Sequence, residues 1–165
     1  MAKMSKDRKI ILILRCAVIL LLAFIWGHSL MNAGDSTQES DAVKGFLTKF
    51  FELFVGKGNV TSHLVRKVAH FTEFSALGVL FEALLHAHRK KTLFYQSYAL
   101  MAGVSAALID ETLQFFSEGR SAKVEDVLLD GAGVLFGLLL CSAVFLIART
   151  VRKSRAKKKT EGQIR

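Results

Sequence analysis

Ionisable and amide side chains recur at helical spacing in three separate parts of this 165-residue chain. His70 and Glu73 are three residues apart, and Asp110 and Gln114 are four apart, so each pair shares one face of a helix. A third pair, Asp126 and Asp130, is also four residues apart. The full set of candidate pocket residues is Lys67, His70, Glu73, Asp110, Glu111, Gln114, Arg120, Asp126 and Asp130. These residue types bind ions and polar headgroups, and they exchange protons.

Several kinds of chemistry are open to this set. Arg120 carries a planar fork that suits a phosphate or a carboxylate. Glu111 directly follows Asp110, and such crowding favours a proton kept on one carboxyl group. Either that carboxyl group or His70 could act as a general acid or base. His70 and the carboxylates could instead hold a divalent metal ion, because helical bundles bind such ions through Glu and His three residues apart. The order here is His-x-x-Glu with a single histidine, so we predict no metal site and no cofactor.

The composition indicates that membrane helices carry these residues. The chain is 52% hydrophobic and has no proline, and its mean hydropathy is +0.36. The apolar content excludes a disordered chain, and two cysteines exclude a disulfide-rich secreted scaffold. Crossing a bilayer takes about 20 mostly apolar residues in a helix. Four stretches meet this requirement: 10–31, 68–88, 93–113 and 124–148. We therefore predict an all-α membrane protein in which four transmembrane helices form a compact bundle.

The positions of lysine and arginine orient the predicted spans. Positive charge collects in the cytoplasmic segments of membrane proteins. The N-terminus 1–9, the loop after the second span and the tail 149–165 hold 15 of the 23 basic residues, whereas seven lie on the opposite side. Both termini are therefore predicted to be cytoplasmic. We interpret the basic tail as a topology anchor beside anionic lipid rather than as a nucleic-acid-binding arm.

An external segment, 32–67, separates the first two spans. Val43, Phe46, Phe50 and Phe54 recur in it at helical spacing, which predicts an amphipathic helix over 42–55 that is too short and too polar to span. This helix could lie along the outer membrane surface or pack against the bundle.

The predicted topology brings the polar residues to one depth. The second span enters from outside, the third leaves there and the fourth re-enters, so their polar ends meet in an outward-opening pocket. Glycines beneath these ends allow close approach of the backbones; they are Gly78, Gly103, Gly133 and Gly137. Because ionisable groups in a membrane are costly, we predict a ligand-binding pocket, with pure helix–helix contacts and catalysis as alternatives. Glu82 lies deeper, and we interpret it as isolated and interfacial.

Two stretches of the chain resemble the signatures of the VanZ-like membrane proteins. The first is Arg66–Phe74 followed by Leu77-Gly78. The second comprises Asp110–Phe116, Gly119-Arg120-Ser121, Asp126-Val127 and Asp130–Gly133. The resemblance covers about residues 66 to 137. Two positions depart from the family pattern: Phe74 stands where a tyrosine is common, and Glu118 where a proline often precedes Gly-Arg.

The resemblance implies a small multi-pass protein of the bacterial cytoplasmic membrane, linked to the cell envelope and to low-level resistance to the glycopeptide teicoplanin. It implies no particular mechanism. The expected partners are the lipid bilayer and a lipid-linked cell-wall precursor or a glycopeptide, with no nucleic acid. The chain could also form an oligomer. One alternative is a membrane-embedded hydrolase or transferase acting on a lipid-linked precursor, although no clear nucleophile is present. The other is a small transporter formed by an oligomer.

Overall fold

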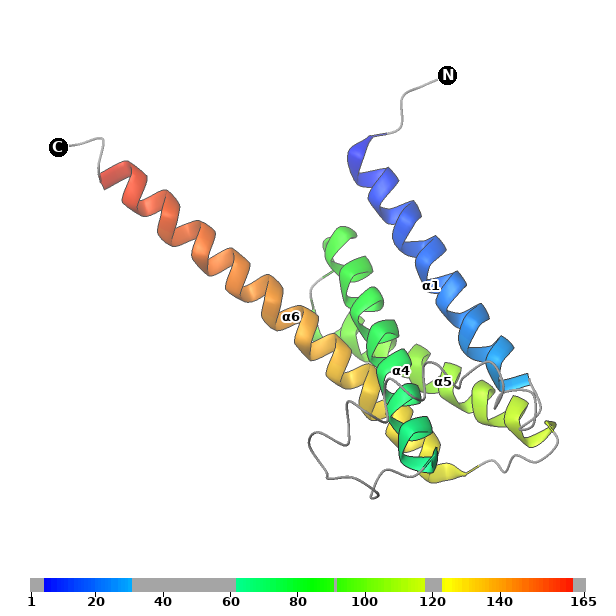
Figure 1. The fold of residues 1–165 in the computed structure, drawn as a ribbon. Helices are drawn as coiled ribbons and strands as arrows, with labels where there is room; N and C mark the ends of the chain where they lie inside the picture. The colour runs from blue at the N-terminus through cyan, green and yellow to red at the C-terminus, as the bar shows by residue number, and fades with distance from the viewer. Residues whose placement is uncertain (1–4, 31–61, 91, 118–122, 162–165) are drawn as a thin grey trace.

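The computed structural model describes residues 5–30, 62–90, 92–117 and 123–161. Within these ranges the chain forms α-helices and no strand (Figure 1). The helices are α1 (Lys6–Leu30), α4 (Ser62–Ala87), α5 (Leu93–Phe115) and α6 (Val124–Glu161). The predicted all-helical fold is confirmed. The amphipathic helix predicted over 42–55 lies outside the described residues.

Three of these helices are long and apolar enough to cross a membrane: Lys6–Leu30, Leu64–Ala87 and Val124–Ala156. α5 is not among them, so the third predicted span is not confirmed. Polar residues occur along its whole length, including Gln96, Ser105 and Asp110. The last helix also continues well beyond its predicted end at Ala148, into the basic tail.

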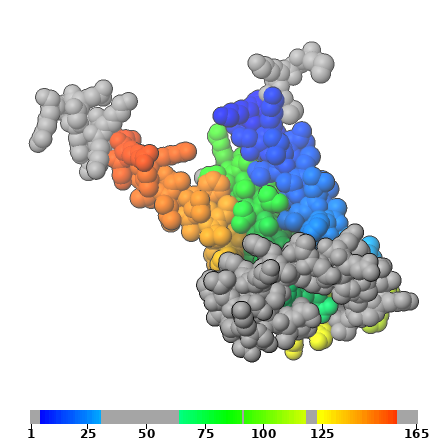
Figure 2. Space-filling model, in the orientation of Figure 1, coloured from blue at the N-terminus to red at the C-terminus, as the bar shows by residue number. Residues whose placement is uncertain are grey.

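α4 is the central helix, in contact with α1, α5 and α6. The amino end of α1 and the carboxyl end of α6 lie at the same end of the molecule, while the start of α4, the end of α5 and the start of α6 gather at the other (Figure 1). The basic C-terminal part of α6 leaves the bundle as a separate arm (Figure 2). Apolar side chains from all four helices share one core, with Phe74, Leu77 and Val134 fully buried at its centre.

Glycines set the spacing between α4 and α6. A Cβ atom added at Gly78 would collide with the backbone carbonyl oxygen of Val134, and one added at Gly137 would collide with that of Ser75. Only hydrogen at the α-carbon permits backbones to come this close. Gly133 likewise faces the carbonyl oxygen of Phe71, whereas Gly103 on α5 lies against the side chain of Val134.

The outer surface of the bundle is apolar, whereas several polar groups are buried. Ile13, Leu20 and Leu139 are 66%, 70% and 61% exposed, and similar side chains cover the outward faces of α1, α5 and α6. Asp110 and Asp130 are 0% and 1% exposed. A water-soluble protein shows the reverse arrangement, because burying a charge is costly and apolar surface avoids water. This surface suits hydrocarbon as its surroundings.

Candidate functional site

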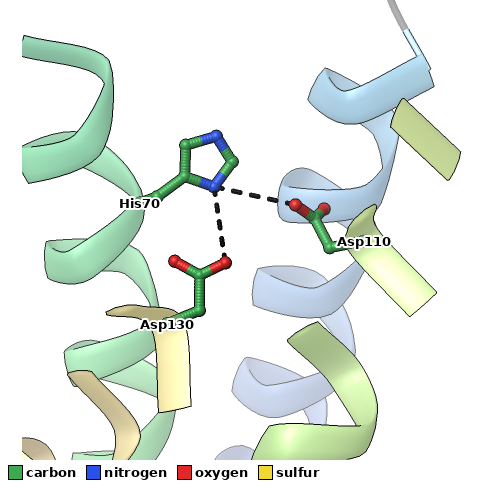
Figure 3. Close-up of side chains that lie close together, drawn as sticks. All are labelled: His70, Asp110 and Asp130. Carbon is green, nitrogen blue, oxygen red and sulfur yellow. Dashed lines mark ion pairs between the residues drawn. The ribbon is translucent and has the colours of Figure 1, made fainter. Parts of the chain in front are cut away.

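Three helices bring ionisable side chains together near one end of the bundle. His70 comes from α4, Asp110 from α5 and Asp130 from α6 (Figure 3). His70 Nδ1 lies 3.6 Å from Asp110 Oδ2 and 4.0 Å from Asp130 Oδ2. All three residues are buried. The sequence placed these residues at the same depth on three helices, and the structure places them in one cluster, which we call the His70 cluster.

Asp110 is held by hydrogen bonds from two helices. Ser29 Oγ on α1 donates to Asp110 Oδ1 at 2.6 Å, and Gln114 Nε2 donates to Oδ2 at 2.8 Å. Ser117 Oγ in turn donates to the carbonyl oxygen of Ser29 at 2.9 Å. Sequence reasoning missed Ser29. The available signal was its place in the last turn of α1, which the predicted topology puts at the depth of the polar ends.

A small cavity opens beside the His70 cluster. The centre of a water molecule can move within about 10 Å³ of this cavity, so the cavity has room for about one water. Its lining residues are Arg66, Lys67, His70, Glu111, Gln114, Asp126, Leu129 and Asp130. Lys67 Nζ lies 3.4 Å from Asp126 Oδ1, and Glu111 Oε2 accepts a 2.9 Å hydrogen bond from the backbone N–H of Lys123. The cavity wall is thus charged, with basic and acidic groups side by side.

Most of the predicted pocket residues meet at this cavity. Those that line it are Lys67, His70, Glu111, Gln114, Asp126 and Asp130. Asp110 lies directly behind His70. Glu73, one turn further along α4, is half-buried and does not line the cavity. Arg120 lies outside the described residues. Arg66 lines the cavity although it was not predicted to; its place next to Lys67 was the signal.

The two aspartates of the His70 cluster differ in the hydrogen bonds that they accept. Both oxygens of Asp110 accept hydrogen bonds, whereas neither oxygen of Asp130 accepts one, although this side chain is 1% exposed. A buried carboxylate is stable only with a proton, a cation or hydrogen-bond donors beside it. His70 lies between two carboxylates and can take up or release a proton there. The arrangement can therefore bind a cation, transfer a proton or hold a polar ligand.

A second buried polar cluster lies deeper in the bundle. Glu82 on α4 is 5% exposed and accepts hydrogen bonds from Ser142 Oγ at 2.8 Å and from Gln96 Nε2 at 3.3 Å. Twelve residues separate it from His70, about 18 Å along the helix. The interpretation of Glu82 as isolated and interfacial is wrong, because its partners come from α5 and α6. We call these three residues the Glu82 cluster.

Comparison with known proteins confirms the resemblance to the VanZ-like family. The family VanZ/LLP1 matches residues 14–147, a range that contains both buried clusters. A search of curated proteins and a search of solved structures found no match. Since the matched range covers most of the chain and includes both stretches that resemble the family, the chain belongs to the VanZ/LLP1 family.

Proposed function

We propose that this protein works at the outer face of the bacterial cytoplasmic membrane, where the His70 cluster binds the polar headgroup of a lipid-linked cell-wall precursor. Through that binding it contributes to envelope homeostasis or to resistance against teicoplanin-type glycopeptides. The carrying observation is the buried His70 cluster next to a charged cavity, near one end of a bundle whose outer surface is apolar. Ionisable groups at such positions in membrane proteins generally serve a ligand or a proton.

The size and charge of the cavity limit which ligands can bind in it. Space for about one water admits an oxygen of a phosphate or a carboxylate, not a whole glycopeptide. Arg66 and Lys67 at the wall supply positive charge for such a group. The acyl chain of the precursor would remain in the bilayer, against the apolar faces of the helices. These features favour the headgroup of the drug's target, rather than the drug, as the ligand.

Substitution of His70 tests this function. In a teicoplanin-sensitive strain, we expect the unchanged chain to confer protection and His70→Ala to abolish it, because the substitution removes the group shared by both aspartates. The matched control is Ser142→Ala, which alters the Glu82 cluster in the same bundle and should leave protection unchanged. Minimal inhibitory concentrations are compared at equal membrane abundance of the proteins. Full protection by His70→Ala would contradict the proposal, and no protection by the unchanged chain would rule out the resistance role.

Catalysis is the second candidate function, and one observation favours it. His70 Nδ1 faces a carboxylate from each of two other helices, a geometry in which imidazole can act as a general base or acid. The protein would then be a hydrolase or transferase acting on the lipid-linked precursor. Lipid analysis of cells with the unchanged chain and with His70→Ala distinguishes the candidates, because only an enzyme changes the turnover of the precursor.

The orientation of the bundle is part of the proposal. We propose that α5 crosses the membrane as a fourth span, with both termini of the chain in the cytoplasm. Its polar residues support this, because Gln96 and Asp110 are bonded to partners inside the bundle rather than facing lipid.

Cysteine labelling checks that topology. In a chain with Cys16 and Cys141 replaced by alanine, a membrane-impermeant maleimide added to intact cells is expected to label Lys123→Cys and not His88→Cys. Both positions are exposed; His88 precedes α5 in the chain and Lys123 follows it. Permeabilised cells provide the control, since both cysteines should then react. Equal labelling of the two in intact cells would mean that α5 does not cross the membrane.

A further inference from the structure

We propose that His70, Asp110 and Asp130 form a binding site for one divalent transition-metal ion, for which Zn²⁺ is a suitable probe. The inference deepens the proposed function, because it concerns the same cluster and rests on that cluster being functional. The two can nevertheless fail separately, since metal binding is measured on purified protein without any envelope ligand.

The distances within the cluster suit ligands of one ion better than hydrogen bonds. His70 Nδ1 lies 3.6 and 4.0 Å from the nearest oxygens of the two aspartates, beyond the usual limit of about 3.2 Å for a hydrogen bond. The three ligand atoms all lie within 4.8 Å of one another. Two ligands of a tetrahedral zinc ion, each about 2.1 Å from the metal, are about 3.4 Å apart. Small side-chain rotations would therefore bring all three atoms onto a common ion.

Asp130 supplies an independent indication of a cation. Its side chain is 1% exposed and points toward His70 (Figure 3), and neither of its oxygens has a hydrogen-bond partner. Such a carboxylate is strongly destabilising unless it takes up a proton or a cation lies next to it. A single proton on His70 Nδ1 could serve only one of the two aspartates, whereas a divalent ion would neutralise both.

The surroundings resemble the outer shell of a metal site. Ser29 and Gln114 donate to Asp110 and fix its orientation, as hydrogen-bond donors do for metal-binding carboxylates. One imidazole and two carboxylates suit a transition metal better than Ca²⁺ or Mg²⁺, which take oxygen ligands. The adjacent cavity holds about one water, which could be the fourth ligand. A headgroup oxygen could replace that water, with Arg66 and Lys67 beside it.

Metal content of the purified full-length chain tests the site. The protein is freed of its affinity tag, stripped with a chelator, dialysed against ZnCl₂ in detergent and measured by mass spectrometry. We expect about one zinc ion per chain. Asp130→Asn should weaken binding at least about tenfold, because it removes one ligand charge. Glu82→Gln is the matched control, since it neutralises a buried carboxylate on α4 outside the cluster, and it should keep full binding.

Cobalt provides a second measurement on the unchanged chain. Co²⁺ in a tetrahedral site of nitrogen and oxygen ligands gives visible absorption bands, which zinc should displace and His70→Ala should abolish. The proposal is overturned if the unchanged chain binds no more zinc than a protein-free control, or if Asp130→Asn binds as tightly as Glu82→Gln. Should Asp130→Asn not yield folded protein, the zinc stoichiometry and cobalt spectrum of the unchanged chain decide. If the unchanged chain binds no zinc but His70→Ala still abolishes protection from teicoplanin, the metal site is overturned and the proposed function is not.

Discussion

Gly137→Ala is expected to lower the free energy of unfolding by about 3 kcal/mol, the upper part of the usual range for overpacking. The added Cβ would collide with the backbone carbonyl oxygen of Ser75 on α4. A side chain could rotate away, but a helix backbone can yield only if the two helices separate, and this would open the most extensive contact in the bundle. Unfolding in mixed micelles of mild detergent and dodecyl sulfate, followed by helix content, measures the change.

Gly27→Ala is the matched control. Gly27 also lies in a helix, in the last turn of α1, but a Cβ there would meet nothing within 4 Å. Since alanine favours helix over glycine by up to about 1 kcal/mol, this variant should be as stable as the unchanged chain or slightly more stable. Equal stability of Gly137→Ala and Gly27→Ala would contradict the close contact between α4 and α6.

The glycine contacts also determine the geometry of the site. Gly133 and Gly137 follow Asp130 on α6, one and two turns away, and they face the segment of α4 that follows His70. A shift of α6 away from α4 would therefore move Asp130 away from His70. We expect Gly137→Ala to weaken metal binding as well as stability, although it lies outside the His70 cluster.

The helices and their glycine contacts follow from local patterns. Apolar runs predicted α1, α4 and α6 because such runs are stable as helices in hydrocarbon. The G-x-x-x-G spacing from Gly133 to Gly137 predicted a close contact because those two residues share a face. The His70 cluster was also indicated by the sequence, because the predicted order and direction of the spans place polar residues of three helices at the same depth in the membrane.

Partners contributed by distant helices could not be predicted in this way. Ser29 pairs with Asp110 only because α1 is rotated to present its hydroxyl inward, and no spacing within α1 specifies that rotation. Glu82 seemed isolated because Gln96 and Ser142 are 14 and 60 residues away in sequence. The size of the cavity likewise depends on side-chain packing, which helix positions do not determine.

Asp110→Ala is expected to have the other large effect, because it would leave two buried donors without their acceptor and would remove a carboxylate from beside His70. The two donors are the hydroxyl of Ser29 and the amide of Gln114. Removing one partner from a buried charged network costs about 3–5 kcal/mol. The bond from Ser29 also ties α1 to α5, so α1 should detach first. Trp26, the only tryptophan of the chain, donates to the carbonyl oxygen of Ala106 on α5 at 3.2 Å, and its fluorescence therefore reports this step.

A double-mutant cycle separates the bond between α1 and α5 from the rest of the loss. If Ser29 acts mainly through Asp110, then Ser29→Ala should destabilise the unchanged chain by about 1.5–3 kcal/mol, the usual range for a hydrogen bond to a charged group. The same substitution should have little effect in the Asp110→Ala background. Additive losses, with a coupling energy below about 0.5 kcal/mol, would mean that the two side chains act independently. Asp110→Asn completes the series: it keeps an acceptor for Ser29 and removes the charge. It should therefore retain the docking of α1, judged by Trp26 fluorescence, and lose the zinc binding that depends on that charge.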